Sequence, residues 1–125
     1  MHPEQLKYSI KQFWLKETGD NIFTIGLTYH YQKQLGNISY LELPPLGEII
    51  NEGEPFGAIE SSKSASDLIG PLSGKVIEVN HTLENKPGLI NKDPYGEAWM
   101  LAIDTSAFDV PKLLTAKEYL DLVGE

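Results

Sequence analysis

A chain of 125 residues is long enough to bury a genuine hydrophobic core and fits a single domain over residues 1–125. Its 18 acidic residues outnumber its 10 lysines, arginine is absent, and the net charge of −8 argues against a nucleic-acid partner, which needs clustered basic residues. Because cysteine is also absent, the chain has no disulfide and no thiolate metal site, and any redox chemistry requires an attached group.

The first residues predict a β-hairpin. Residues 8–16 are rich in aromatic and β-branched side chains and are predicted to form one continuous strand. Turn-forming residues at 19–21 separate this strand from a second one over residues 22–27. We expect the core of the domain to span about residues 7–104.

A short helix and a third strand are predicted next. Thr28 is a favourable N-cap for a helix over residues 29–35, and Gly36 stands where a left-handed C-cap is favoured. Residues 37–43 alternate in polarity and predict a strand that two prolines end. Residues 47–55 predict a short strand and a turn.

The centre of the chain predicts a second hairpin with Lys63 near its tip. Residues 56–59 and 68–69 form the expected strands, and Lys63 stands between them among small and acidic residues. A solvated turn charge is the usual role of such a lysine. Schiff-base lysines are activated by burial or by cationic neighbours, so this exposed lysine suits modification by another enzyme better than catalysis.

The second half of the chain predicts two strands and a helix. Residues 75–80 predict a strand, whereas residues 81–94 contain too many glycines and prolines for regular structure. Residues 99–103 predict the last strand. Over residues 115–123, a capping-box pattern precedes apolar residues at helical spacing, so we expect an amphipathic C-terminal helix.

The stretch around Lys63 reads Glu60-Ser61-Ser62-Lys63-Ser64-Ala65-Ser66-Asp67. It resembles the modification motif of a known family of lipoyl carriers, the glycine cleavage system H proteins. Their motif is Glu-Ser-Val-Lys followed by small residues and Ser-Asp. Gly47 and Gly74 lie where lipoyl domains carry glycines, and residues 71–80 and 91–100 resemble two further blocks of the family. The resemblance runs from about residue 7 to residue 124.

The resemblance implies a mainly β, lipoyl-domain-like barrel-sandwich hybrid. It consists of two small, similar sheets, with a short helix after the first hairpin and a C-terminal helix, and its closed strands leave no exposed edges. The implied function is that of a non-catalytic carrier with lipoate on Lys63 as a swinging arm, attached by a lipoate ligase or a lipoyl or octanoyl transferase. The residues expected to serve recognition by modifying enzymes and partners are Glu60, Ser61, Ser62, Ser64, Asp67, Gly47 and Gly74.

In this family the arm carries the aminomethyl fragment of glycine. The implied partners are a pyridoxal-phosphate glycine decarboxylase, a tetrahydrofolate-dependent aminomethyltransferase and dihydrolipoamide dehydrogenase. The chain departs from the family pattern where Phe13 stands in place of a glutamate and Tyr29 in place of an aspartate. The expected arm cleft, with Phe13, Tyr29 and His30, is therefore less attractive to an ammonium group, apart from a weak cation–π contribution.

These departures leave other functions open. H-like lipoyl carriers also serve sulfur oxidation with heterodisulfide-reductase-like complexes, or relay lipoate to other enzymes. An unmodified interaction module is a further alternative, and it predicts that Lys63 stays a free amine. The three histidines, His2, His30 and His81, lack the spacing of metal ligands. No apolar run approaches a membrane span and the first residues lack signal-peptide character, so we expect a cytoplasmic protein without a membrane partner.

Overall fold

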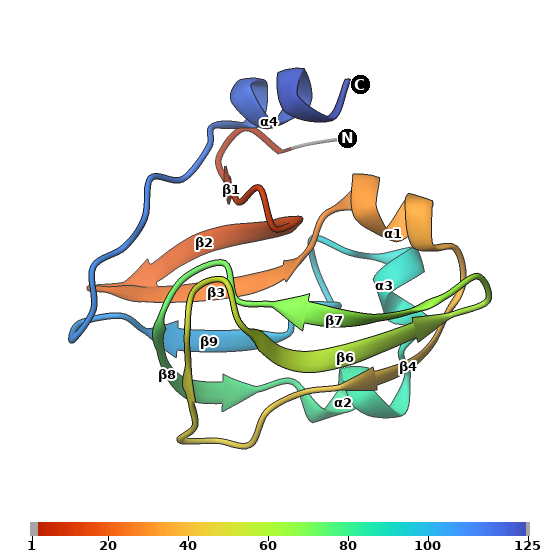
Figure 1. Ribbon diagram of the computed structural model, residues 1–125, viewed down its shortest axis with the longest axis horizontal. Helices are drawn as coiled ribbons and strands as arrows, with labels where there is room; N and C mark the ends of the chain where they lie inside the picture. The colour runs from red at the N-terminus through yellow and green to blue at the C-terminus, as the bar shows by residue number, and fades with distance from the viewer. Residues whose placement is uncertain (1–2, 125) are drawn as a thin grey trace.

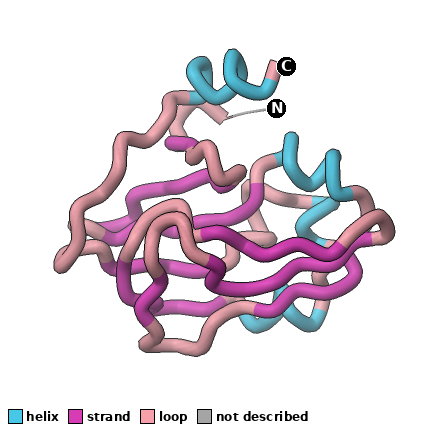
Figure 2. Tube along the Cα trace, viewed as in Figure 1, coloured by secondary structure: helices cyan, strands magenta, loops and turns pink. Residues whose placement is uncertain are grey.

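A computed structural model describes residues 3–124 of the protein as two β-sheets packed on a common core, with four short helices (Figures 1 and 2). This arrangement confirms the predicted mainly β fold. The strands of the described range are β1 (Lys7–Tyr8), β2 (Phe13–Gly19), β3 (Ile22–Leu27), β4 (Ile38–Glu42), β5 (Ile49–Ile50), β6 (Pro55–Ser61), β7 (Ala65–Ile69), β8 (Gly74–Val79) and β9 (Leu101–Asp104). The helices are α1 (Tyr29–Leu35), α2 (His81–Asn85), α3 (Leu89–Lys92) and α4 (Ala116–Val123).

The two sheets are unequal in size. The larger sheet has the strand order β1-β2-β3-β9-β8-β5, the smaller one has the order β4-β6-β7, and all pairs are antiparallel. The expectation of two similar sheets is therefore wrong. Over the described residues both sheets are open, so the expected closure without exposed edges is not formed. Pro44 and Pro45 lie between β4 and β5, where the chain leaves one sheet for the other.

Alternation along the strands places one face of each sheet in the core. On β2, Phe13 and Leu15 are 1% and 0% exposed and belong to this core, whereas Trp14 between them packs on the opposite face of the sheet. The smaller sheet contributes Leu41, Ile59 and Leu68. The core therefore holds the hairpin β6–β7 against the larger sheet.

Two predictions of local structure are wrong. Residues 8–16 form two strands, because the chain reverses through a turn in which the Gln12 N–H donates to the Ser9 carbonyl and Gln12 takes a φ of 77°. As a result β1 folds back on β2, with Tyr8 opposite Trp14. Residues 81–94 contain α2 and α3, since Pro87 and the glycine after it fall between these helices and interrupt neither of them.

The predicted ends of α1 and α4 are largely confirmed. The Thr28 hydroxyl oxygen accepts a hydrogen bond from the Tyr31 N–H at 3.2 Å. Gly36 ends α1 with a φ of 80°, but its ψ of −156° lies outside the left-handed helical region that we predicted. A capping box begins α4, and the Thr115 N–H that donates to Glu118 holds the pKa of this carboxyl below its usual range.

Helix α4 docks through Tyr119, which is 0% exposed. Its ring stacks on Tyr8 with the centroids 4.9 Å apart. Its hydroxyl donates to Gln12 Oε1 at 2.6 Å and lies 2.7 Å from Thr28 Oγ1. One side chain therefore fastens the C-terminal helix to the turn before β2 and to the N-cap of α1.

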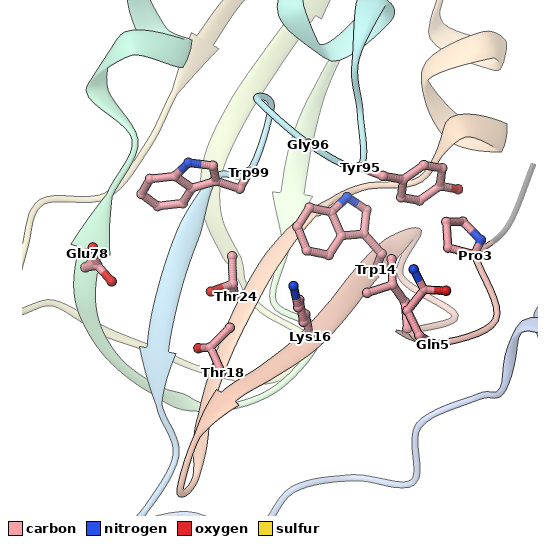
Figure 3. Close-up of a pocket in the computed structure, with 11 residues that line it drawn as sticks. Pro3, Gln5, Trp14, Lys16, Thr18, Thr24, Glu78, Tyr95, Gly96 and Trp99 are labelled. Carbon is pink, nitrogen blue, oxygen red and sulfur yellow. The ribbon is translucent and has the colours of Figure 1, made fainter.

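The outer face of the larger sheet carries a groove of about 470 Å³, beside which Trp14 and Trp99 lie (Figure 3). The ring of Trp14 covers Gly26, its cross-strand partner. A Cβ at position 26 would stand only 2.6 Å from three atoms of this ring. The Trp14 Nε1–H also donates to the Pro94 carbonyl at 2.8 Å. Glycine at position 26 thus allows the indole to lie flat on β3.

We expect Gly26→Ala to lower the free energy of unfolding by about 1–3 kcal/mol, because the added methyl group displaces the Trp14 ring from a packed position. Urea denaturation measures this change. Gly88→Ala is the matched control, since a Cβ there meets no atom within 4 Å, and it should alter stability by less than about 0.5 kcal/mol. Equal stability of the two variants would contradict this role of Gly26.

Candidate functional site

Lys63 lies in the turn between β6 and β7 with its side chain exposed. Ser61 closes this turn: its Oγ accepts hydrogen bonds from the N–H groups of Lys63 and Ser64, both at 3.2 Å. The Ser61 N–H donates to the Ser64 carbonyl at 2.8 Å, and the Ser61 hydroxyl donates to the same oxygen at 3.3 Å. Short polar side chains therefore order the backbone of the turn and leave the lysine outside it.

The turn rests on the end of α1. The Ser62 N–H donates to the Asn37 carbonyl at 3.0 Å. A Cβ on Gly36 would lie 3.2 Å from Ser62 Oγ and 3.5 Å from Lys63 Cε, so the carbon stem of Lys63 passes over the bare α-carbon of Gly36. Figure 1 shows this turn at the end of the molecule where α1 and α3 lie side by side.

Carboxylates gather on the outer face of the smaller sheet. Glu60 lies opposite Ala65 and Asp67 opposite Ala58, and because paired residues point to the same side, both carboxylates share one face. The two small alanines leave a hollow of about 250 Å³ that Glu60 and Asp67 help to line. Sequence reasoning missed a third exposed carboxylate on this face, Glu42, which the pairing of β4 with β6 places opposite Ala58.

The structure does not bring Gly47 and Gly74 to Lys63. Gly47 has a φ of 90° and donates its N–H to the Val76 carbonyl at 2.8 Å. Gly74 lies in β8, where a Cβ would stand 2.7 Å from the Asp104 carbonyl oxygen. Gly74 pairs with Ile50 of β5 and Gly47 bonds to β8, so both glycines shape the larger sheet near its β5 edge. The β6–β7 turn belongs to the smaller sheet.

Both the sequence and the fold of the chain are similar to those of known proteins. The profile of the family described as glycine cleavage H-protein matches residues 6–125. The chain belongs to this family. It is 43% identical to the glycine cleavage system H protein of Bacillus licheniformis over 98% of this chain and 97% of the relative, and 43% identical to that of Halalkalibacterium halodurans over 98% and 96%. The crystal structure of a glycine cleavage system H protein from Mycobacterium marinum has a TM-score of 0.90 and 34% identity, and covers 98% of this chain and 99% of its own.

Membership of the H-protein family decides the class of activity. H proteins are lipoyl carriers in glycine cleavage and do not catalyse a reaction, so this chain is a carrier and not an enzyme.

Within residues 3–124 no group of three or more histidine, aspartate or glutamate side chains is arranged to hold a metal ion. His81 Nδ1 lies 3.1 Å from Glu84 Oε1 at the surface, whereas His2 lies outside the described residues. The described range also holds no helix long and apolar enough to cross a membrane.

The three residues expected in the arm cleft lie near the start of α1. Phe13 is 1% exposed, and its ring packs against Phe56 at 5.7 Å, so its side chain is part of the core. Tyr29 is half-buried, and its N–H donates to the Tyr95 hydroxyl at 3.0 Å. His30 is 9% exposed and stands edge-on to Tyr119. The length of α1, about 10 Å for seven residues, separates Tyr29 and His30 from the Lys63 turn.

We expect Ser61→Ala to increase hydrogen exchange at the amides of Lys63 and Ser64 by about tenfold, because each amide loses its acceptor. Global stability should fall by less than about 1 kcal/mol, since the turn is exposed. Ser62→Ala is the control, because the contact of Ser62 with Asn37 is made by its backbone N–H. Unchanged exchange in Ser61→Ala would show that the serine does not order the turn.

Proposed function

We propose that the protein carries lipoate in amide linkage on Lys63 and in that form shuttles the aminomethyl group of glycine between the enzymes of glycine cleavage. The observation that carries this proposal is an exposed lysine on an ordered turn, in a chain that matches the H-protein family almost from end to end. The exposure of Lys63 gives a modifying enzyme access to the amine, and the ordered turn presents it in one place.

The site fits a covalently attached lipoyl group. The carbon stem of Lys63 already passes over Gly36, where the missing Cβ leaves room, and the exposed side chain continues into solvent. When bound, the lipoyl group supplies a dithiolane that accepts the aminomethyl group from one enzyme and yields it to another. The chain's own contribution is tethering: a group fixed to Lys63 meets each partner's active site at a high effective concentration.

The outer face of the smaller sheet is the proposed docking surface for the enzyme that attaches lipoate, a lipoate ligase or a lipoyl or octanoyl transferase. Glu42, Glu60 and Asp67 are exposed there, next to the strands that lead into the Lys63 turn. A basic surface on the modifying enzyme complements these carboxylates, and the net charge of −8 steers the same encounter from longer range. Ser62 and Ser64 offer little bulk at the turn itself, so the enzyme can approach Lys63 closely.

The proposed partners in the cycle are a pyridoxal-phosphate glycine decarboxylase, a tetrahydrofolate-dependent aminomethyltransferase and dihydrolipoamide dehydrogenase. The relatives from Bacillus licheniformis and Halalkalibacterium halodurans are both named glycine cleavage system H proteins, which favours this cycle over a sulfur-oxidising complex or a lipoate relay. We further propose that an arm lying along α1 reaches the half-buried Tyr29, which stands one helix length from the turn, next to the buried His30.

Modification is expected at Lys63 alone. Incubation with lipoate, ATP and a lipoate ligase should add the mass of one lipoyl group to the protein and nothing to Lys63→Arg, because arginine keeps the charge but stays protonated and is not acylated. Intact-mass spectrometry measures the product, and Lys16→Arg, a change of an exposed lysine on the larger sheet, should be modified normally. A modified Lys63→Arg protein would place the lipoyl group elsewhere.

Glycine–bicarbonate exchange tests the pathway separately. The lipoylated protein should support this exchange with a glycine decarboxylase, and Lys63→Arg treated in the same way should not. A fully lipoylated sample that supports no exchange, even with the decarboxylase of its own source, would exclude glycine cleavage and leave lipoyl carriage in place. If the lipoate ligase adds no lipoyl group to the protein, the alternative of an interaction module that functions without lipoate would be favoured.

A further inference from the structure

Asn91, in α3, forms hydrogen bonds with both the end of α1 and the start of β4. Its Nδ2 donates to the Gly36 carbonyl and to Gln32 Oε1, both at 2.9 Å. Its Oδ1 accepts from the Ile38 N–H, also at 2.9 Å. The Asn91 amide therefore donates two hydrogen bonds and accepts one, and all three partners lie within residues 32–38.

These hydrogen bonds satisfy backbone groups that regular structure leaves open. The last carbonyl groups of a helix lack partners within the helix, and the carbonyl of Gly36, which ends α1, finds its partner in Asn91. The Ile38 N–H at the first residue of β4 finds its partner in the same side chain. Asn91 thus fixes the backbone on both sides of Asn37.

The backbone that Asn91 fixes is the support of the lysine turn. The Asn37 carbonyl accepts the Ser62 N–H at 3.0 Å, and the stem of Lys63 lies over Gly36. Ile38 pairs with Ser61, the residue that closes the turn. Any shift of residues 36–38 is therefore transmitted to both the backbone and the side chain at the tip of the hairpin.

We propose that Asn91 is a positioning residue for modification of Lys63, and this inference rests on the proposed function of that lysine. Asn91 itself does not touch the amine. It holds residues 36–38, and through them the turn, in the arrangement that the modifying enzyme binds. When the turn is free to leave this arrangement, the binding-competent fraction of the protein falls and the apparent affinity falls in proportion.

This mechanism predicts a specific kinetic signature. Loss of a positioning residue should raise the KM of the modifying enzyme for the carrier and leave kcat nearly unchanged, because a saturating enzyme still captures the competent form. Asn91→Ala removes three partly buried hydrogen bonds, which together should change the equilibrium between the competent and the incompetent turn by about a hundredfold. From a competent fraction of about nine-tenths, this change leaves about one-tenth, so we expect the KM to rise by about tenfold. A purely structural defect would lower the amount of folded protein and leave the KM of the folded fraction unchanged.

The chain offers a matched control in Asn80. The Nδ2 of Asn80 also donates to two oxygens, the carbonyls of Glu97 at 3.0 Å and Trp99 at 2.7 Å. These partners hold the segment before β9 and take no part in residues 36–38. Substitution of Asn80 therefore removes the same kind of interaction from the same small protein without touching the support of Lys63.

The experiment measures lipoylation kinetics of the full chain with a purified lipoate ligase for Asn91→Ala and Asn80→Ala, with urea denaturation of each. We expect the KM to rise about tenfold only in Asn91→Ala, with kcat within about twofold of the unchanged protein. Asn91→Asp should raise the KM at least as much, because its carboxylate faces two acceptor oxygens.

Three results separate the possible failures. An unchanged KM in Asn91→Ala, or an equal rise in Asn80→Ala, would overturn the positioning role. If Asn91→Asp does not fold, Asn91→Ala still decides the question, since it removes the hydrogen bonds without adding a charge. Absence of lipoylation in the unsubstituted protein would instead refute the proposed function, so the two proposals fail by different observations.

Discussion

The position of Lys63 depends on three residues of backbone, 36–38, that end α1 and begin β4. Gly36 supplies a positive φ that turns the chain away from the helix, and it has no side chain to push the lysine aside. The Asn37 carbonyl holds the β6–β7 turn through the Ser62 N–H. A helix end, a strand start and a hairpin tip therefore share one set of hydrogen bonds.

A carrier lysine must be accessible and yet stay in one place, and this fold meets both needs without apolar packing at the tip. The inward-facing core side chains of the hairpin strands end at Ile59 and Leu68, and the residues of the turn are exposed or half-buried. Order at the tip comes from Ser61 and from backbone hydrogen bonds. Polar contacts of this kind fix a backbone while they leave a side chain in water.

The neighbourhood where the chain departs from the family pattern is filled by aromatic and hydroxyl groups. Phe13 packs in the core against Phe56, so the absence of a carboxylate at this position is compensated by apolar burial. Next to Phe13, the Tyr119 hydroxyl bridges Gln12, just before β2, and Thr28, just before α1. The C-terminal helix is in this way coupled to the first turn of α1, next to Tyr29 and His30.

The sequence by itself determined the features that depend on neighbouring residues: the N-caps of α1 and α4, the lysine hairpin, and the family block around Lys63. Periodicity could not show that residues 8–16 fold back on themselves, because Gln12 takes its positive φ within a tertiary arrangement. Only the tertiary structure placed Glu42 beside Glu60 and Asp67 and brought Asn91 to Gly36, 55 residues away. Local patterns specify which segments form elements, whereas contacts between distant segments are chosen by how those elements pack on a common core.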